Sequence, residues 1–325
     1  MEQNNSTGYA ALRRGAAIVD RSSSGRILLT GADRRSYLQG LLTNDIAALG
    51  PGEGCYAALL NAQGRMIADM RVVELGDAVL LDVAPHVAAT VRAHLERFVF
   101  SEDVEVRDLT AERAEVGVYG PGAASVVADV IGAAVPQLPL HGSARATFDG
   151  SSALLVRSDE FGVDGYDLIV DRAQRDALVR ALMNAGAVGA EDADVEAARI
   201  ESGRPRFGVD MTEDTIPLEA AIEDRAISRT KGCYVGQEVI VRVLDRGHGR
   251  VARRLVGLTL RGADAAPGAA IASDGKEIGR VTSATRSPAL GQPIALGYVH
   301  RDFVAPGTAV TIAGVPALVT ALPFV

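Results

Sequence analysis

The N-terminal third of the chain alternates short apolar runs with amphipathic stretches, a pattern that indicates a lobe of mixed strands and helices. Apolar runs between turn residues predict strands at 26–30 and 78–83 and a hairpin over 55–75. Apolar residues at helical spacing predict one helix over 31–46 and another from Pro85 to about Phe98.

The same kind of pattern returns in the middle of the chain. Strands are predicted at 115–120, 153–158 and 166–171, and helices at 121–132, 172–186 and 193–202. Residues 204–220 contain two prolines and an acidic cluster, and predict irregular structure. The sequence therefore predicts two lobes that each contain both strands and helices, an α+β fold.

The pattern changes near Gly247. After it, short alternating runs are separated by Gly, Pro and Asp turns, which predicts a small all-β barrel or sandwich of about 75 residues. We therefore expect two intertwined α+β lobes over 1–247 and a C-terminal β-barrel domain over 248–325.

Composition narrows the class of protein. The net charge of −8 over 325 residues argues against general nucleic-acid binding. The start, MEQNNSTGYAALRRG, lacks the apolar core of a secretory signal, and no run of about 18 apolar residues occurs. The two cysteines form no CxxC or Cys/His group, which argues against structural zinc and disulfides. We expect a soluble cytoplasmic protein without a metal site.

The sequence contains no P-loop, HExxH or GxSxG motif, so it gives no support for a common kinase or hydrolase.

The most informative short segment is KGCYVGQE at 231–238. It holds Lys231, one of two lysines, and Cys233, one of two cysteines. A lysine near a cysteine lowers the pKa of the thiol, and glycines allow a ligand to approach the backbone. The alternative is a glycine turn with a buried, inert cysteine. After it, an apolar stripe favours a helix opened by Gly236 over a strand.

Asp69 stands among apolar neighbours on the second strand of the predicted hairpin, five residues after the turn glycine Gly64. A carboxylate there could act as a base if it is partly desolvated. The alternative is an exposed strand position. Arg199 belongs to a cluster of charged residues around Gly203. It could hold a carboxylate bidentately or pair with Glu196 and Asp210.

Several long segments together resemble one family. They are GRILLTGADRRSYLQGLLTNDI at 25–46, the run from Asn61 to Asp69, RIESGRPRFGVDMTEDTIPLEA at 199–220, and KGCYVGQEVIVRV at 231–243. The chain resembles the YgfZ group of folate-binding proteins, which is related to the T-protein, the aminomethyltransferase of glycine cleavage. The resemblance implies a three-domain ring, with two α+β, ferredoxin-like lobes, a C-terminal barrel and tetrahydrofolate in the central hole.

The resemblance also implies roles for single residues. Asp69 would lie beside the reactive folate nitrogen, and Arg199 near the folate glutamate carboxylate. Tyr56 and Asn61 would face the pterin. Tyr166, in the segment DGYD, and Gln237, in the segment KGCYVGQE, complete the expected folate-binding residues.

One departure from the T-protein pattern bears on function. Where T-proteins carry a glutamate that recognises the pterin ring, this chain has Val163, and Glu160 or Asp164 would have to substitute. T-proteins also generally lack the cysteine that Cys233 represents.

Three functions stay open. The first is a tetrahydrofolate-binding accessory protein for iron–sulfur enzymes, including those that modify transfer RNA, with Cys233 as the reactive thiol and Lys231 keeping it ionised. The second is a tetrahydrofolate-dependent aminomethyltransferase with a lipoyl carrier protein as partner. The third is a scaffold without ligand chemistry.

Overall fold

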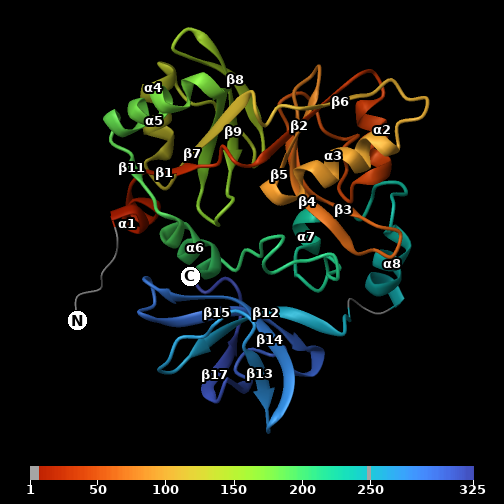
Figure 1. Ribbon diagram of the computed structural model, residues 1–325, viewed down its shortest axis with the longest axis vertical. Helices are drawn as coiled ribbons and strands as arrows, with labels where there is room; N and C mark the ends of the chain where they lie inside the picture. The colour runs from red at the N-terminus through yellow and green to blue at the C-terminus, as the bar shows by residue number, and fades with distance from the viewer. Residues whose placement is uncertain (1–6, 247–249) are drawn as a thin grey trace.

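The computed structural model describes residues 7–246 and 250–325. Three bodies make up the molecule, two sheet-containing lobes side by side and a barrel below them (Figure 1). The chain begins in the six-stranded lobe, crosses to build the five-stranded lobe, and returns to complete the first. The two lobes are therefore intertwined, because the five-stranded lobe is inserted in sequence between β1 and β7 of the six-stranded lobe.

The five-stranded lobe has the strand order β3-β4-β5-β2-β6. Its strands are β2 (Gly25–Thr30), β3 (Gly54–Leu60), β4 (Met66–Glu74), β5 (Val79–Val83) and β6 (Glu105–Asp108). Its helices are α2 (Arg34–Leu41) and α3 (Ala88–Arg97), the latter preceded by the 3-10 turn η1 (Pro85–Val87). Both helices bury their apolar residues against one face of the sheet.

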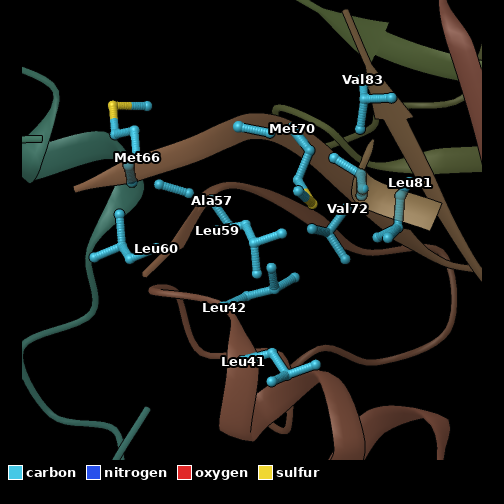
Figure 2. Close-up of a cluster of buried hydrophobic side chains, with 14 of the residues drawn as sticks. Leu41, Leu42, Ala57, Leu59, Leu60, Met66, Met70, Val72, Leu81 and Val83 are labelled. Carbon is cyan, nitrogen blue, oxygen red and sulfur yellow. The ribbon is translucent and has the colours of Figure 1, made fainter. Parts of the chain in front are cut away.

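The core of this lobe follows from the two-residue period of its strands. In β4, Met66, Ala68, Met70 and Val72 are buried in the core, whereas Arg71 and Val73, on the opposite face, contact the other lobe. Figure 2 shows Leu41 and Leu42, at the end of α2, beside Leu59 in this core.

The predicted helix over 31–46 is too long. Leu42 leaves the helix in an extended conformation, and the Thr43 amide donates to the carbonyl of Ala58 on β3. Pairing with the sheet thus replaces the helix after Leu41.

The six-stranded lobe has the strand order β11-β1-β7-β10-β9-β8. Its strands are β1 (Ala17–Asp20), β7 (Arg113–Tyr119), β8 (Ser143–Phe148), β9 (Ser151–Ser158), β10 (Gly165–Asp171) and β11 (Val188–Gly189). Its helices are α1 (Thr7–Arg14), α4 (Ala123–Ile131) and α5 (Arg175–Asn184), with the turn η2 (Arg172–Gln174) before α5. Helices α4 and α5 cover one face of this sheet.

A connecting segment and a barrel complete the fold. The segment holds α6 (Asp192–Glu201), α7 (Glu223–Ala226), α8 (Gln237–Val241) and the π-helical turn η3 (Arg242–Arg246). The closed barrel has β12 (Arg253–Leu260), β13 (Ala270–Ser273), β14 (Lys276–Ser287), β15 (Gln292–His300), β16 (Ala309–Ile312) and β17 (Val315–Thr320), with the turn η4 (Arg301–Phe303). The α+β fold with two lobes and a C-terminal barrel is thereby confirmed. The expected domain boundary at 247/248 lies outside the described residues and stays a prediction.

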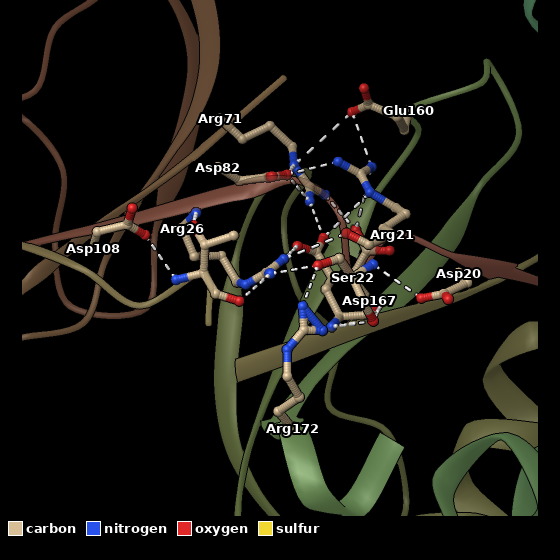
Figure 3. A network of polar contacts seen from close by, with 12 residues as sticks. Asp20, Arg21, Ser22, Arg26, Arg71, Asp82, Asp108, Glu160, Asp167 and Arg172 are labelled. Atoms are coloured by element: carbon tan, nitrogen blue, oxygen red, sulfur yellow. Dashed lines mark hydrogen bonds and ion pairs between the residues drawn. The ribbon is translucent and has the colours of Figure 1, made fainter. Parts of the chain in front are cut away.

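The two lobes meet through a buried network of charges (Figure 3). Arg71 of β4 donates from Nη1 to Asp167 of β10 at 2.5 Å and from Nη2 to Glu115 of β7 at 2.6 Å. Its Nε donates to Asp82 of β5 at 2.8 Å. One guanidinium therefore joins carboxylates from both sheets, and beside it Val73 and Leu80 pack against Val156 and Ile169.

This network predicts a large loss of stability when Arg71 is removed. In Arg71→Met the carboxylates of Asp167 and Glu115 lose their shared cation, so the free energy of unfolding should fall by about 3–5 kcal/mol in urea titrations. The matched control is Arg92→Met, which breaks an exposed pair with Glu96 and should leave the urea midpoint near that of the wild type. Equal effects of the two substitutions would contradict the importance of the network.

Candidate functional site

A cavity of about 260 Å³ lies where the two lobes meet the connecting segment. We call it the interlobe cavity. The residues that line it come from both lobes, from α6 and from the loop after α6, and they include Arg21, Tyr56, Asp69, Arg71, Asp82, Glu160, Phe161, Arg199, Arg204, Arg206 and Phe207. Three of the residues expected from the sequence, Tyr56, Asp69 and Arg199, are therefore brought together here.

Tyr56 and Asp69 form a hydrogen-bonded pair on the cavity wall. They stand on the paired strands β3 and β4, where Tyr56 is opposite Arg71 and Asp69 is opposite Ala58. The hydroxyl of Tyr56 donates to Oδ2 of Asp69 at 2.6 Å, and the guanidinium of Arg225 lies 4.8 Å from the Tyr56 ring centre.

The pair gives the cavity a carboxyl group that titrates near neutral pH. Burial raises the pKa of Asp69 to about 6, although the hydrogen bond from Tyr56 lowers it. At neutral pH the carboxylate can accept a proton, as a general base requires.

Arg199 has every donor occupied. Its Nε and Nη2 donate to the carboxylate of Glu196, Nη1 donates to Asp210 and to the carbonyl of Arg204, and Nη2 also donates to Ser283 of β14. The pairing with Glu196 and Asp210, one of the two alternatives from the sequence, is the one the structure has. No N–H group of Arg199 is left for a ligand carboxylate, whereas Arg206, half exposed and 3.2 Å from Glu196, can still receive one.

The KGCYVGQE segment lies apart from the interlobe cavity, on the end of α2. The ammonium of Lys231 donates to the carbonyls of Gln39, Leu42 and Asn44 at 2.7, 2.5 and 3.0 Å. Lys231 therefore caps the C-terminus of α2, whose last carbonyls have no helical partner. Burial lowers the pKa of Lys231 to about 8, and the thiol to which it is electrostatically coupled is that of Cys55.

Cys233 is exposed between two anchors of the same segment. On one side Lys231 is buried, and on the other the amide of Val235 donates to the carbonyl of Gly40 at 3.2 Å. Gly236, with a φ of 83°, precedes the first residue of α8, so the predicted helix opened by Gly236 is present. Its backbone packs against the carbonyl of Asn61. The expectation that this cysteine is buried, one of the two alternatives, is wrong because Cys233 is exposed, and its reactivity stays a prediction.

The other expected residues stand outside the interlobe cavity. Oδ1 of Asn61 accepts from the amides of Gln63 and Arg65, so it holds the hairpin turn together. Gln237 begins α8 beside that turn. Tyr166 lies on β10, but on the face that packs toward α4 and α5, because its neighbour Asp167 takes the face toward the other lobe.

Sequence reasoning missed Asp82, Phe161 and Phe207 in the cavity lining, and it also missed the cations of the site. Arg21 and Arg71 line the cavity, and Arg225 stacks on Tyr56. Nothing in their local sequence marks them, because their partners come from distant strands.

Two family models together match almost the whole chain. They describe the GCVT N-terminal domain, over residues 1–231, and the glycine cleavage T-protein C-terminal barrel domain, over residues 253–325. The chain belongs to the glycine cleavage T-protein family.

Curated relatives and a solved structure agree with the family. The aminomethyltransferase of Rubrobacter xylanophilus is 32% identical, over 97% of this chain and 85% of its own length. That of Nostoc sp. is 30% identical, over 97% of this chain and 86% of its own. The crystal structure of the glycine cleavage system aminomethyltransferase T from Bartonella henselae has a TM-score of 0.90 at 27% identity, and the match covers 98% of this chain and 88% of that one.

Val163, where the resemblance led us to expect a pterin-recognising glutamate, lies in the core. Val163 is buried with Tyr119 and Ala198. Of the two expected substitutes, Asp164 is largely exposed and lies 3.6 Å from Arg157, whereas Glu160 lines the interlobe cavity.

Glu160 is held ionised by the charge network (Figure 3). Its Oε2 lies 3.3 Å from Nη1 of Arg21 and 3.9 Å from Nε of Arg71. Burial alone would raise the pKa of Glu160, but the two arginines lower it to about 2. Near it, Oδ1 of Asp82 is buried and has no hydrogen-bond donor within the described part of the chain. The wall therefore offers acceptor oxygens to a ligand that brings N–H groups.

The described residues were also inspected for metal-binding clusters and for membrane-spanning helices. Residues 7–246 and 250–325 contain no group of three or more His, Cys, Asp or Glu side chains placed to hold a metal ion. Within the same ranges, no helix has the length and apolar character needed to span a membrane.

The raised pKa of Asp69 predicts a pH-dependent difference in stability. Because the pKa is about 6 in the folded chain instead of 3.8, the stabilisation from protonated Asp69 is present below about pH 4 and is lost as the pH rises through about 6. Relative to Asp69→Asn, the wild-type free energy of unfolding should therefore fall between about pH 4 and about pH 6.5 in urea titrations and stay level at higher pH.

Tyr56→Phe is the matched variant for this test. Loss of the hydroxyl removes a hydrogen bond that lowers the folded-state pKa of Asp69, so the fall should extend to higher pH while its lower limit stays near about pH 4. Parallel pH profiles for wild type and Asp69→Asn would show that Asp69 does not titrate in this range.

Proposed function

We propose that the interlobe cavity binds a reduced folate such as tetrahydrofolate, and that the chain is a cytoplasmic accessory protein of the YgfZ type. In this proposal it assists the assembly or maintenance of iron–sulfur enzymes, including those that modify transfer RNA. The observation that carries the folate part is the Tyr56–Asp69 pair facing Glu160 across one cavity. Membership of the T-protein family supports it.

The chemistry of the cavity fits a pterin. The pyrimidine edge of a pterin presents N–H donors side by side, and a fixed carboxylate accepts such a pair. Glu160 supplies that carboxylate, and the unpaired oxygen of Asp82 is a second acceptor. The rings of Tyr56, Phe161 and Phe207 give the aromatic surface on which a flat ring stacks.

Arg206 replaces Arg199 in our assignment of the folate carboxylate. All five donors of Arg199 are used internally, whereas the Arg206 guanidinium is exposed at the cavity and, among the described residues, pairs only with a partly exposed Glu196. An exposed pair of this kind is worth little, so a ligand carboxylate can compete for the guanidinium.

Asp69 is the residue that handles a proton. When bound, a reduced folate supplies a nucleophilic ring nitrogen that accepts a one-carbon unit. Asp69, with a pKa of about 6, is ionised at neutral pH and can take or return a proton at that end of the cavity. Tyr56 orients the carboxylate through its hydrogen bond.

Cys233 is the candidate reactive thiol of the accessory role. It is exposed, and the buried Lys231 fixes the segment that presents it. Because the segment lies apart from the interlobe cavity, a client protein can reach the thiol without displacing the folate.

A second function is favoured by Asp69 and by the relatives that bear the name aminomethyltransferase. In it, the chain would transfer a one-carbon unit from an aminomethyl-lipoyl carrier protein to tetrahydrofolate. The buried Val163 opposes this reading, since the T-protein pattern has a glutamate there.

The folate proposal predicts binding that depends on two carboxylates. Anaerobic calorimetry with tetrahydrofolate should give micromolar affinity for the wild type. Glu160→Gln and Asp69→Asn should each weaken the affinity about 10-fold or more, because each removes a hydrogen bond with a charged group. Asp164→Asn, at an exposed carboxylate outside the cavity, is the control and should bind like the wild type. Absence of binding, or equal binding by all variants, would refute the folate site.

The role of Cys233 predicts a phenotype that separates the two functions. In a strain that lacks this protein, Cys233→Ala should fail to restore iron–sulfur enzyme activity, whereas the partly buried Cys55→Ala should restore it. The aminomethyltransferase instead predicts that purified protein releases ammonia from an aminomethyl-lipoyl carrier and that Cys233→Ala leaves this turnover unchanged. Full rescue by Cys233→Ala, together with ammonia release, would overturn the accessory role in favour of the transferase.

A further inference from the structure

A second cavity opens between the two lobes, at the far end of the strands that border the interlobe cavity. Its volume is about 530 Å³, and none of its lining residues is shared with the interlobe cavity. We call it the outer groove. On β4 and just after it, Asp69 lines the interlobe cavity, Arg71 joins the charge network, Val73 packs between the lobes, and Leu75 lines the outer groove. The two cavities are therefore separated by the network and by the apolar contact.

The walls of the outer groove are apolar and come from both sheets. Leu28 and Leu80 belong to the five-stranded lobe, and Leu154 and Ile169 to the six-stranded lobe. All four belong to, or pack against, the apolar cluster that joins the lobes. A cavity of this size with mainly apolar walls is typical of sites for small organic molecules.

The charges of the outer groove favour an anion. Its lining holds three arginines, Arg26, Arg113 and Arg145, and one carboxylate, Asp77. Arg145 pairs with Asp77 at 3.2 Å, but both side chains are largely exposed. Arg113 pairs with Asp171 at 2.7 Å, and these side chains are also exposed in part. Exposed pairs of this kind are worth little, so a carboxylate can compete for the guanidinium of Arg113.

Arg26 provides an independent sign of a missing partner. It is fully buried, and its Nη groups donate to backbone carbonyls and to Glu115. Its Nε is buried without a hydrogen-bond acceptor among the residues that the structure describes. Since buried donors are nearly always satisfied, an unpaired guanidinium N–H on a residue that lines a cavity is a donor that an acceptor oxygen of a ligand would satisfy.

We propose that the outer groove binds a small amphiphilic carboxylate, with its carboxylate at the Arg26–Arg113 end and its apolar part against the leucines of both sheets. Arg113 supplies the charge, and Nε of Arg26 supplies a donor. The apolar tail fills the space over Leu28, Leu80 and Leu154. This site is separate from the folate proposal and does not depend on it.

Decanoate is a suitable probe because it has one carboxylate and one apolar chain. Titration into the full-length protein should give saturable binding with one site per chain. Arg113→Gln should weaken decanoate binding about 10-fold or more, because an ionic hydrogen bond is lost at a side chain that is exposed enough to be replaced without unfolding. Decanol, with the same chain and no charge, should bind at least about 10-fold more weakly than decanoate.

Two further variants locate the site. Leu154→Gln places a polar group in the apolar wall and should weaken decanoate binding, with unchanged circular dichroism as the check of folding. Asp69→Asn, in the other cavity, should bind decanoate like the wild type. The proposal would be overturned if decanoate does not bind, if decanol binds equally well, or if Arg113→Gln has no effect. Loss of binding in Asp69→Asn alone would assign decanoate to the interlobe cavity and would also overturn it.

Discussion

The arrangement of this protein depends on one buried guanidinium, that of Arg71. It lies between two sheets that belong to different lobes, and it takes carboxylates from both of them, Asp82 on one side and Asp167 and Glu115 on the other. A buried arginine is tolerated only when its donors are paired, so the lobes must meet in the register that brings these groups together. The positions of both cavities follow from that register.

The network also separates the chemistry of two carboxyl groups in the interlobe cavity. Glu160 lies beside Arg21 and Arg71, which lower its pKa to about 2 and keep it ionised. Asp69 lies beyond the network on the same strand face as Arg71, and burial raises its pKa to about 6. One cavity thus holds a fixed acceptor for recognition and a group that can exchange a proton, the division of roles that acid–base sites in general use.

Local pattern in the sequence predicted the lobes, the barrel and the place of Asp69, because strand and helix periods and a carboxylate among apolar residues are local signals. It could not predict what distant residues do to one another. The pairing of Arg199 with Glu196 and Asp210 was one of two alternatives from the sequence, but its donation to Ser283 of β14 could not be foreseen. Helix α2 stops at Leu41 because β3 competes for the next residues, and the short edge strand β6 gives too little pattern to detect.

The KGCYVGQE segment shows the same limit at short range. Lys231 and Cys233 are two positions apart, yet the lysine turns inward to cap α2 and the cysteine turns outward to solvent. Nearness in sequence suggested that the lysine ionises the thiol, but the structure gives the ammonium three carbonyl acceptors. Lys231 therefore anchors the segment that carries the exposed Cys233 to the end of α2.

The most direct test of the central claim is a crystal structure of the protein with 5-formyltetrahydrofolate, a stable reduced folate. The account predicts electron density for the pterin in the interlobe cavity, with its N–H edge on Glu160, its ring beside Tyr56 and its reactive nitrogens toward Asp69. Density only in the outer groove, or an interlobe cavity with water alone at saturating ligand, would contradict the claim that this cavity is a folate site.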